Sequence, residues 1–191
     1  MKETWKQIWL RKGMAEGSIE DMLAFDGYEK TKIDMKQVAM SIIKELDIKK
    51  DDRVLEVGCG AGALAQYLQC DYVGVDYSPT LVKKHIKFLE NSVLTGEADN
   101  LIFKDKTFDK VIAYGIFMYF NDKEYAQRAI SEFKRVAKKG ILLGDLPMKS
   151  HNSDHLLFSK EEFEGWKITE GFYDPYRDKR FNATMLMESF E

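Results

Sequence analysis

Residues 53–76 read RVLEVGCGAGALAQYLQCDYVGVD, and this stretch decides the fold of the chain. It begins with a short, apolar, β-branched run from Arg53 to Val57, which predicts a strand. The run breaks at a tight glycine turn, Gly58-Cys59-Gly60-Ala61-Gly62, and the residues after the turn have helical character. A second apolar run then ends at the carboxylate of Asp76. The stretch therefore predicts a β-α-β unit built around a glycine turn.

Two classes of cofactor use such a turn. Gly58, Gly60 and Ala63 satisfy the G-x-G-x-x-G/A pattern of dinucleotide-binding folds, and Asp76 lies near the expected distance for a ribose contact. Glu56 decides between the classes, because it comes two residues before the first glycine, at the expected carboxyl end of the strand. Its carboxylate would repel a pyrophosphate and attract a ligand that carries an ammonium and a sulfonium. The turn therefore favours a cationic ligand.

This segment resembles motif I of the class I S-adenosylmethionine-dependent methyltransferases, which reads E/D-x-G-x-G-x-G and is here Glu56-Val57-Gly58-Cys59-Gly60-Ala61-Gly62. The resemblance extends from about Val54 to Leu143. It implies that the cofactor is S-adenosyl-L-methionine, with S-adenosyl-L-homocysteine as the product. It also implies an α/β fold: a Rossmann-like, doubly wound, seven-stranded, mostly parallel sheet whose last strand is antiparallel, plus an N-terminal helical flap.

The resemblance assigns residues to the cofactor. The glycine backbone would lie against its methionine part, and Asp76 would accept hydrogen bonds from the two ribose hydroxyls. Asp99, within an A-D-x-L sequence, would accept a hydrogen bond from the adenine amino group; alternatively it caps a helix before Leu101. The expected cofactor-binding residues are Glu56, Gly58, Cys59, Gly60, Gly62, Asp76, Tyr77, Ala98, Asp99, Tyr114 and Tyr28.

Composition favours an ordinary globular protein. The 191 residues, 45% of them hydrophobic, predict a single domain, in which residues 33–191 form the core and residues 1–32 the flap. A net charge of -3 gives no global attraction to nucleic acid. No apolar run is long enough to span a bilayer and no signal peptide is evident, so a cytoplasmic protein is expected. Cys59 and Cys70 do not indicate a disulfide framework, and no spacing typical of metal ligands occurs.

The flap has two interpretations. Trp5 and Trp9 stand four residues apart and predict a short helix with one aromatic face, which Gly13 and Gly17 would end. The segment that follows, residues 18–30, has few core anchors and includes an Asp26-Gly27 turn signal. It either packs on the edge of the sheet or closes as a lid over cofactor and substrate, with Tyr28 reaching the cofactor.

The rest of the chain alternates predicted helices and strands. An apolar stripe at residues 33–46 predicts a helix, as does the segment 80–90 behind Ser78 and Pro79, in which His85 is expected on a solvated face. A third helix is expected to run from a cap at residues 121–122 to Arg135. The remaining strands are expected at residues 92–95, 108–114, 141–144, 166–173 and 180–187.

Residues beyond the fourth and fifth strands are candidates for the acceptor site, because open α/β sheets bind ligands at the carboxyl ends of their strands. Asp145, His151 and His155 are the candidate general bases, each with a structural alternative. Tyr119 is expected to line the pocket. Tyr176 and Arg177 are candidates to hold an anionic substrate, although Arg177 could equally pair with Asp174 or Asp178 on the surface.

The leading hypothesis is a small-molecule methyltransferase, with O-methylation of a metabolite or sugar-like acceptor preferred and a monomer or homodimer expected. A non-catalytic module that binds S-adenosylmethionine and serves another protein is the rival from a different class. A nicotinamide-dependent oxidoreductase is the third hypothesis; it predicts NADH binding that improves when Glu56 becomes Gln.

Overall fold

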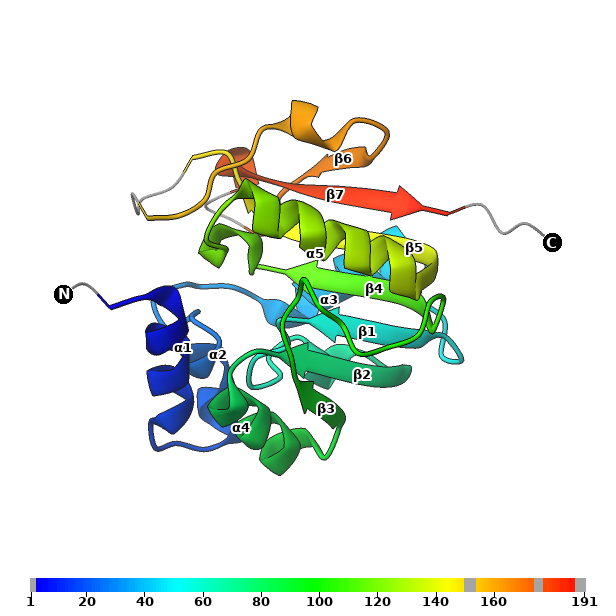
Figure 1. Ribbon diagram of the computed structural model, residues 1–191. Coiled ribbons are helices and arrows are strands. Elements are labelled where there is room, and N and C mark those ends of the chain that lie inside the picture. The colour runs from blue at the N-terminus through cyan, green and yellow to red at the C-terminus, as the bar shows by residue number, and fades with distance from the viewer. Residues whose placement is uncertain (1–2, 150–153, 174–176, 188–191) are drawn as a thin grey trace.

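Seven strands form one sheet in the order β3-β2-β1-β4-β5-β7-β6 (Figure 1). The computed structural model describes residues 3–149, 154–173 and 177–187. The strands are β1 (Arg53–Val57), β2 (Asp71–Asp76), β3 (Ser92–Thr95), β4 (Phe108–Tyr114), β5 (Ala137–Pro147), β6 (Lys167–Glu170) and β7 (Arg180–Leu186). Strand β7 runs antiparallel to both β5 and β6, and the other pairs are parallel. The predicted Rossmann-like sheet with an antiparallel last strand is confirmed.

Helices cover both faces of this sheet (Figure 1). They are α1 (Trp5–Met14), α2 (Met22–Phe25), α3 (Met35–Leu46), α4 (Pro79–Leu89) and α5 (Lys123–Val136), with 3₁₀ turns η1 (Ile19–Asp21), η2 (Ala65–Tyr67), η3 (Phe117–Tyr119), η4 (Lys160–Phe163) and η5 (Arg177–Lys179). Residues of α3 and α4 belong to one buried apolar cluster and residues of α5 to another. The two clusters therefore lie on opposite sides of the sheet. No helix within the described ranges is both long and apolar enough to cross a membrane.

Polar side chains begin these helices, and two of them, Ser78 and Asp122, stand where the sequence predicts a cap. Asp34 accepts a hydrogen bond from the amide of Gln37, Ser78 from that of Leu81, and Asp122 from that of Tyr125. Each interaction satisfies one of the amides that the first turn of a helix leaves without a partner. The helix starts were readable from the sequence because these caps are local.

The prediction of a helix after the glycine turn is wrong, because only the 3₁₀ turn η2 forms there. The connection between β1 and β2 is residues 58–70, and the glycine turn takes the first five of them. Only the other eight remain for the return and the entry into β2, and even all eight in α-helix would advance only about 12 Å. The chain must return along four steps of strand, about 13 Å. A more extended path is therefore needed, and a 3₁₀ turn provides it.

Candidate functional site

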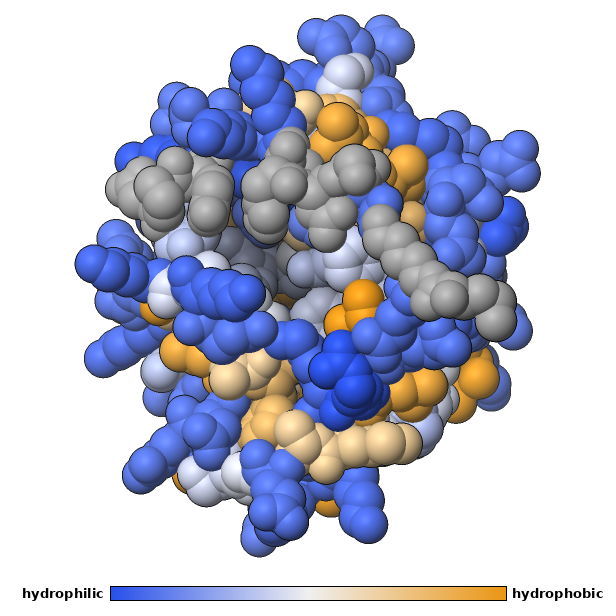
Figure 2. All heavy atoms as spheres, turned by 90° about the vertical axis from the view of Figure 1, so that its left-hand side faces the viewer, coloured by the Kyte–Doolittle hydropathy of each residue, from blue (hydrophilic) through white to orange (hydrophobic). Residues whose placement is uncertain are grey.

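A cavity of about 380 Å³ opens at the carboxyl edge of the parallel strands, where the ends of β1, β2 and β4 meet helix α1. Figure 2 looks onto this side of the molecule and shows a recess near its centre. Most of the residues expected to bind cofactor or substrate line the cavity: Tyr28, Glu56, Gly58, Cys59, Gly60, Asp76, Tyr77, Ala98, Tyr114 and Tyr119. The structure therefore brings together side chains from five separate segments of the chain.

The glycine turn needs its glycines for two reasons. Gly58 and Gly60 have φ of +77° and +52°, a region that side chains strain to adopt. A β-carbon on Gly58 would lie 2.3 Å from the Ile116 side chain, and one on Gly60 would lie 2.1 Å from the Asp26 carboxylate. The amides of Gly58 and Cys59 both donate to the carbonyl of Val75, which ties the turn to β2. The backbone of the turn is thus fixed close to its neighbours.

Asp26 of the flap is bound to this turn, a contact that sequence analysis missed. Its Oδ1 accepts a hydrogen bond from the amide of Ala61 at 2.6 Å, and its Oδ2 accepts one from the amide of Ala63 at 2.9 Å. These amides belong to the part of a glycine turn that holds a pyrophosphate in dinucleotide folds. Here a carboxylate of the chain itself occupies them. The sequence signalled only the turn at Asp26-Gly27, and its long-range partner lay 35 residues away.

Three carboxylates crowd around the turn. Glu56 accepts a hydrogen bond from the Tyr72 hydroxyl at 2.7 Å, and burial raises its pKa to about 8. Asp76 accepts hydrogen bonds from the amides of Gly60 and Ser78, and burial raises its pKa to about 6. Burial also raises the pKa of Asp26 to about 7, against the effect of its amide donors, and the charge of Asp76 raises it further. Burial is the largest cause of all three shifts, and no cation is among the groups that act on these pKa values.

His85 lies directly under the turn, so its prediction as a solvated side chain is wrong. The ring is completely buried and stacks on Tyr72 with centroids 5.7 Å apart. Its Nδ1 donates to the carbonyl of Gly60, and its Nε2 accepts from the amide of Asn91, each at 3.2 Å. Burial lowers the pKa of His85, which fits this neutral tautomer. The lysines beside it in sequence suggested solvent, but they lie on other faces of α4.

In the loop after β3, Glu97 lines the cavity and Asp99 does not. Asp99 faces α5, where it makes an ion pair with Arg128 at 3.0 Å. Glu97 accepts hydrogen bonds from Lys6 at 2.6 Å and from the Tyr125 hydroxyl at 3.0 Å. The carboxylate of this loop that lines the cavity is therefore Glu97, two residues before the one expected. The A-D-x-L motif placed the loop correctly and did not distinguish its two acids.

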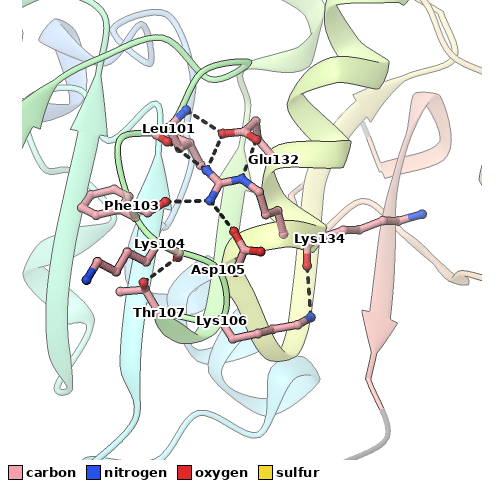
Figure 3. Close-up of polar contacts among 9 residues, drawn as sticks. Leu101, Phe103, Lys104, Asp105, Lys106, Thr107, Glu132 and Lys134 are labelled. Atoms are coloured by element: carbon pink, nitrogen blue, oxygen red, sulfur yellow. Dashed lines mark hydrogen bonds and ion pairs between the residues drawn. The ribbon is translucent and has the colours of Figure 1, made fainter.

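Helix α5 holds this loop along one face. Arg135 donates to the carbonyls of Leu101 and Phe103 and to the carboxylate of Asp105, at 2.7 to 2.9 Å. Glu132 accepts from both Arg135 and the amide of Leu101, so that the two side chains form one network (Figure 3). Tyr125, Arg128, Glu132 and Arg135 recur at helical spacing. One face of α5 therefore fixes the loop whose other end lines the cavity.

Helix α1 covers the opposite wall. The backbone carbonyls of Trp5, Trp9 and Leu10 accept hydrogen bonds from the side chains of Tyr77, Ser78 and Thr80 at 3.3, 3.4 and 2.8 Å. The rings of Trp5 and Trp9 lie 4.8 and 5.0 Å from that of Tyr119. The flap thus contributes to the cavity wall rather than packing on a distant edge of the sheet.

Of the candidate bases, Asp145 and His155 lie at this end of the sheet, although neither is among the lining residues. Asp145 has a left-handed backbone with φ of +59°, and one carboxylate oxygen lies 3.7 Å from the guanidinium of Arg180. Burial raises its pKa to about 6, and Arg180 opposes the shift. The His155 ring lies 5.3 Å from Trp5 and 5.5 Å from Tyr119. His151 lies outside the described residues.

Arg177, one of the two candidates for an anionic substrate, is not brought to the cavity. Arg177 donates to the carbonyl of Gly171 at 3.2 Å and lies 3.7 Å from the Glu170 carboxylate, with its side chain 56% exposed. Tyr176 lies outside the described residues. Strand β6 runs parallel to β5, as expected, but Arg177 contacts Glu170 and Gly171 at the end of that strand. Gly62 also stands outside the lining, where it faces Leu89 and His85.

Comparison with known proteins agrees with this geometry. Residues 55–143 match the family described as "Methyltransferase domain". An uncharacterised protein of Methanocaldococcus jannaschii is 32% identical over 142 residues, which cover 73% of this chain and 57% of the relative. The probable tRNA methyltransferase 9B of Mus musculus is 35% identical over 98 residues, which cover 49% of this chain and 21% of the relative. The chain thus spans about half the length, or less, of the curated relatives it matches.

A solved structure shows the same fold over nearly the whole chain. The magnesium protoporphyrin IX methyltransferase of Synechocystis, crystallised with bound S-adenosylmethionine, is similar over 95% of this chain and 90% of that chain. The TM-score is 0.63 and the sequence identity is 16%.

Proposed function

Because this chain belongs to the class I S-adenosylmethionine-dependent methyltransferases, we propose that it transfers a methyl group from S-adenosylmethionine to a small-molecule acceptor, with a hydroxyl as the preferred target. We also propose that it does so in the cytoplasm, as a monomer or a homodimer. The free thiols of Cys59 and Cys70 suit a reducing compartment.

One observation carries the choice of cofactor: the amides of the glycine turn are already bound to Asp26, while Glu56 and Asp76 present further carboxylates beside them. A pyrophosphate would have to displace Asp26 and then lie among negative charges. A ligand with an ammonium and a sulfonium meets complementary charge instead. Asp76 would hold the ribose hydroxyls, Glu97 and Ala98 would face the adenine, and Glu56 would face the amino-acid part.

The protein's contribution to the chemistry is alignment and exclusion of water. The cofactor, when bound, supplies a methyl group already activated on a sulfonium. Tyr28, Tyr114 and Tyr119 form the wall near the end of β4, where the acceptor would be held in line with the methyl group. Such orientation can lower a barrier by about 7 to 11 kcal/mol in favourable cases.

An acceptor hydroxyl must lose its proton as the new C–O bond forms and the C–S bond breaks. We propose that Asp145 accepts this proton. Its charge helps to raise the pKa values of Tyr28, Tyr114 and Tyr119, so it lies near all three. Its own pKa of about 6 leaves it ionised near neutral pH. General base catalysis by such a group typically contributes about 10²- to 10⁴-fold. His155 is the second candidate, through its contact with Tyr119.

We propose a neutral acceptor rather than an anionic one. Among the described lining residues the sole cation is Lys6, and it is already paired with Glu97. Arg177, the residue expected to hold a phosphate or carboxylate, is occupied by Glu170 and Gly171 outside the cavity. Replacing Arg177 by Ala should therefore leave the Michaelis constant of the acceptor unchanged.

The test of this function is transfer of labelled methyl from S-adenosylmethionine into a small-metabolite extract, followed by identification of the labelled product. Wild-type protein should label at least one small molecule, and Asp145→Asn should lower the rate about 10²-fold or more while binding S-adenosylhomocysteine normally. Cofactor binding without labelling of any pool, RNA and protein included, would instead favour a non-catalytic binding module.

A further inference from the structure

The segment from Asp26 to Tyr28 joins the flap (residues 1–32) to the floor of the cavity. Asp26 binds the amides of the glycine turn, as described above. Gly27 lies under the ring of Trp9, where a β-carbon would come within 2.7 Å of it. The hydroxyl of Tyr28 reaches the backbone of Gly115 at the end of β4. The flap therefore contacts the core through Asp26 and Tyr28, which both line the cavity, while Gly27 between them packs within the flap.

The Asp26 carboxylate retains binding capacity after it accepts the two amides. A carboxylate has about four lone-pair sites. Asp26 uses two of them on the amides of Ala61 and Ala63, and the amide of Gly62 also acts on it, so capacity for a further donor remains. The residue itself lines the cavity, so the remaining capacity lies where a ligand would contact it.

Glu56 faces the same corner with an oxygen that has no partner. The residue is 4% exposed, and its Oε2 accepts from Tyr72. Its Oε1 makes no hydrogen bond within the described part of the chain and is not among the fully buried atoms without a partner, so it is open to the cavity. Glu56 also lines the cavity, and the charge of Asp26 raises its pKa. A carboxylate so largely removed from water is costly unless it is protonated or a ligand supplies a donor. The donor that fits two adjacent carboxylates is an ammonium group.

We propose that Asp26 and Glu56 together bind the α-ammonium of the cofactor, so that the flap closes on the amino-acid part of the cofactor and not on its adenosine. This inference rests on the function proposed above and adds to it a binding residue and a role for the flap. Asp76 and Glu97, which belong to the core, would bind the adenosine whether or not the flap is closed.

Calorimetry and hydrogen exchange on the full chain separate the two halves of the ligand. S-adenosylhomocysteine carries the ammonium; 5′-methylthioadenosine keeps the adenosine and the sulfur but has no amino-acid part. With wild-type protein, S-adenosylhomocysteine should slow exchange in residues 15–32, and 5′-methylthioadenosine should bind without slowing it. A deaminated analogue of S-adenosylhomocysteine should behave like 5′-methylthioadenosine, and this arm needs no mutation.

Asp26→Asn then tests the residue itself. It should weaken the binding of S-adenosylhomocysteine about tenfold or more, because a hydrogen bond between charged groups is lost. The affinity for 5′-methylthioadenosine should change by less than about twofold. Glu29→Gln is the matched control, because it removes one negative charge from the same flap at a side chain that pairs with Lys12 outside the cavity. It should change neither affinity.

Three results would overturn the proposal. One is that Asp26→Asn weakens the binding of both ligands equally, which would show that Asp26 only stabilises the glycine turn. Another is equal protection of the flap by 5′-methylthioadenosine and S-adenosylhomocysteine. The third is a deaminated analogue that binds as tightly as S-adenosylhomocysteine. Failure of wild-type protein to bind any of these ligands would be a different result, because it removes the proposed function as well.

Discussion

Glu56 and Asp26 are the residues on which the choice of cofactor depends. Glu56 was identifiable from the sequence because its position relative to the glycines is local. Asp26 was not, since its partners lie 35 and 37 residues further along and no periodicity links them. His85 shows the same limit: charged neighbours in the sequence say little about a side chain that α4 directs inward. Local chemistry was readable, and contacts made by folding were not.

Replacing Glu56 by Gln should weaken the binding of S-adenosylhomocysteine about 10- to 100-fold, because the substitution removes the charge that faces the ammonium of the ligand. Tyr72→Phe is the control: it removes the hydrogen bond to Glu56 and leaves the carboxylate. Titration calorimetry measures both. The account would be contradicted if Glu56→Gln bound the ligand as well as wild type did, or if it gained affinity for NADH.

Replacing His85 by Ala should lower the thermal midpoint by about 5 to 15 °C. The variant loses buried ring packing and two hydrogen bonds, about 2 to 4 kcal/mol together, and each kcal/mol corresponds to about 2 to 4 °C in a chain of this size. Lys83→Ala, an exposed position on the same helix, should change the midpoint by under about 2 °C. Equal midpoints for the two variants in a calorimetric scan would contradict a buried, stabilising position of His85.

At the scale of elements, the strands and capped helices followed from the sequence, since period, caps and turn residues are short-range signals. The connection from β1 to β2 did not, because its helical composition was overruled by the distance it must cover. The loop after β3 was placed correctly, and yet its cavity residue is Glu97 and not Asp99. That difference is set by α5, which pairs Asp99 with Arg128.

The network of Arg135 predicts that α5 affects cofactor affinity from a distance. Arg135→Met should raise the dissociation constant of S-adenosylhomocysteine about 3- to 10-fold, because the loop that carries Glu97 and Ala98 loses its anchors at Leu101, Phe103 and Asp105. Lys134→Met, one position away and exposed, should have no such effect. Hydrogen exchange should rise in residues 101–107 of the first variant alone. Unchanged exchange there would show that Arg135 does not hold the loop.

For the molecule as a whole, the cavity concentrates carboxylates whose pKa values are raised in the folded state. Burial raises the pKa values of Asp26, Glu56 and Asp76 to about 7, 8 and 6, from ordinary values of 3.8, 4.5 and 3.8. The folded protein therefore binds more protons than the unfolded chain across this range. The stability that protonation supplies is complete below about pH 4 and is lost as the pH rises through about 6 to 8.

The thermal midpoint of the ligand-free protein should accordingly fall between pH 6 and pH 8.5, and saturating S-adenosylhomocysteine should reduce the fall, because its ammonium takes over the role of the protons. Asp26→Asn, which removes one of the titrating groups, should make the ligand-free profile shallower. Differential scanning calorimetry across this range provides the measurement. A ligand-free midpoint that rises with pH would have the opposite sign and would contradict the assignment of these groups.

The most direct test of the central claim is titration calorimetry of the wild-type chain with S-adenosylhomocysteine and, under the same conditions, with NADH. The account predicts saturable binding of S-adenosylhomocysteine with one ligand per chain and no heat from NADH. Tight binding of NADH with none of S-adenosylhomocysteine would show that the glycine turn accepts a pyrophosphate despite Glu56 and Asp26, and the proposed activity would be wrong.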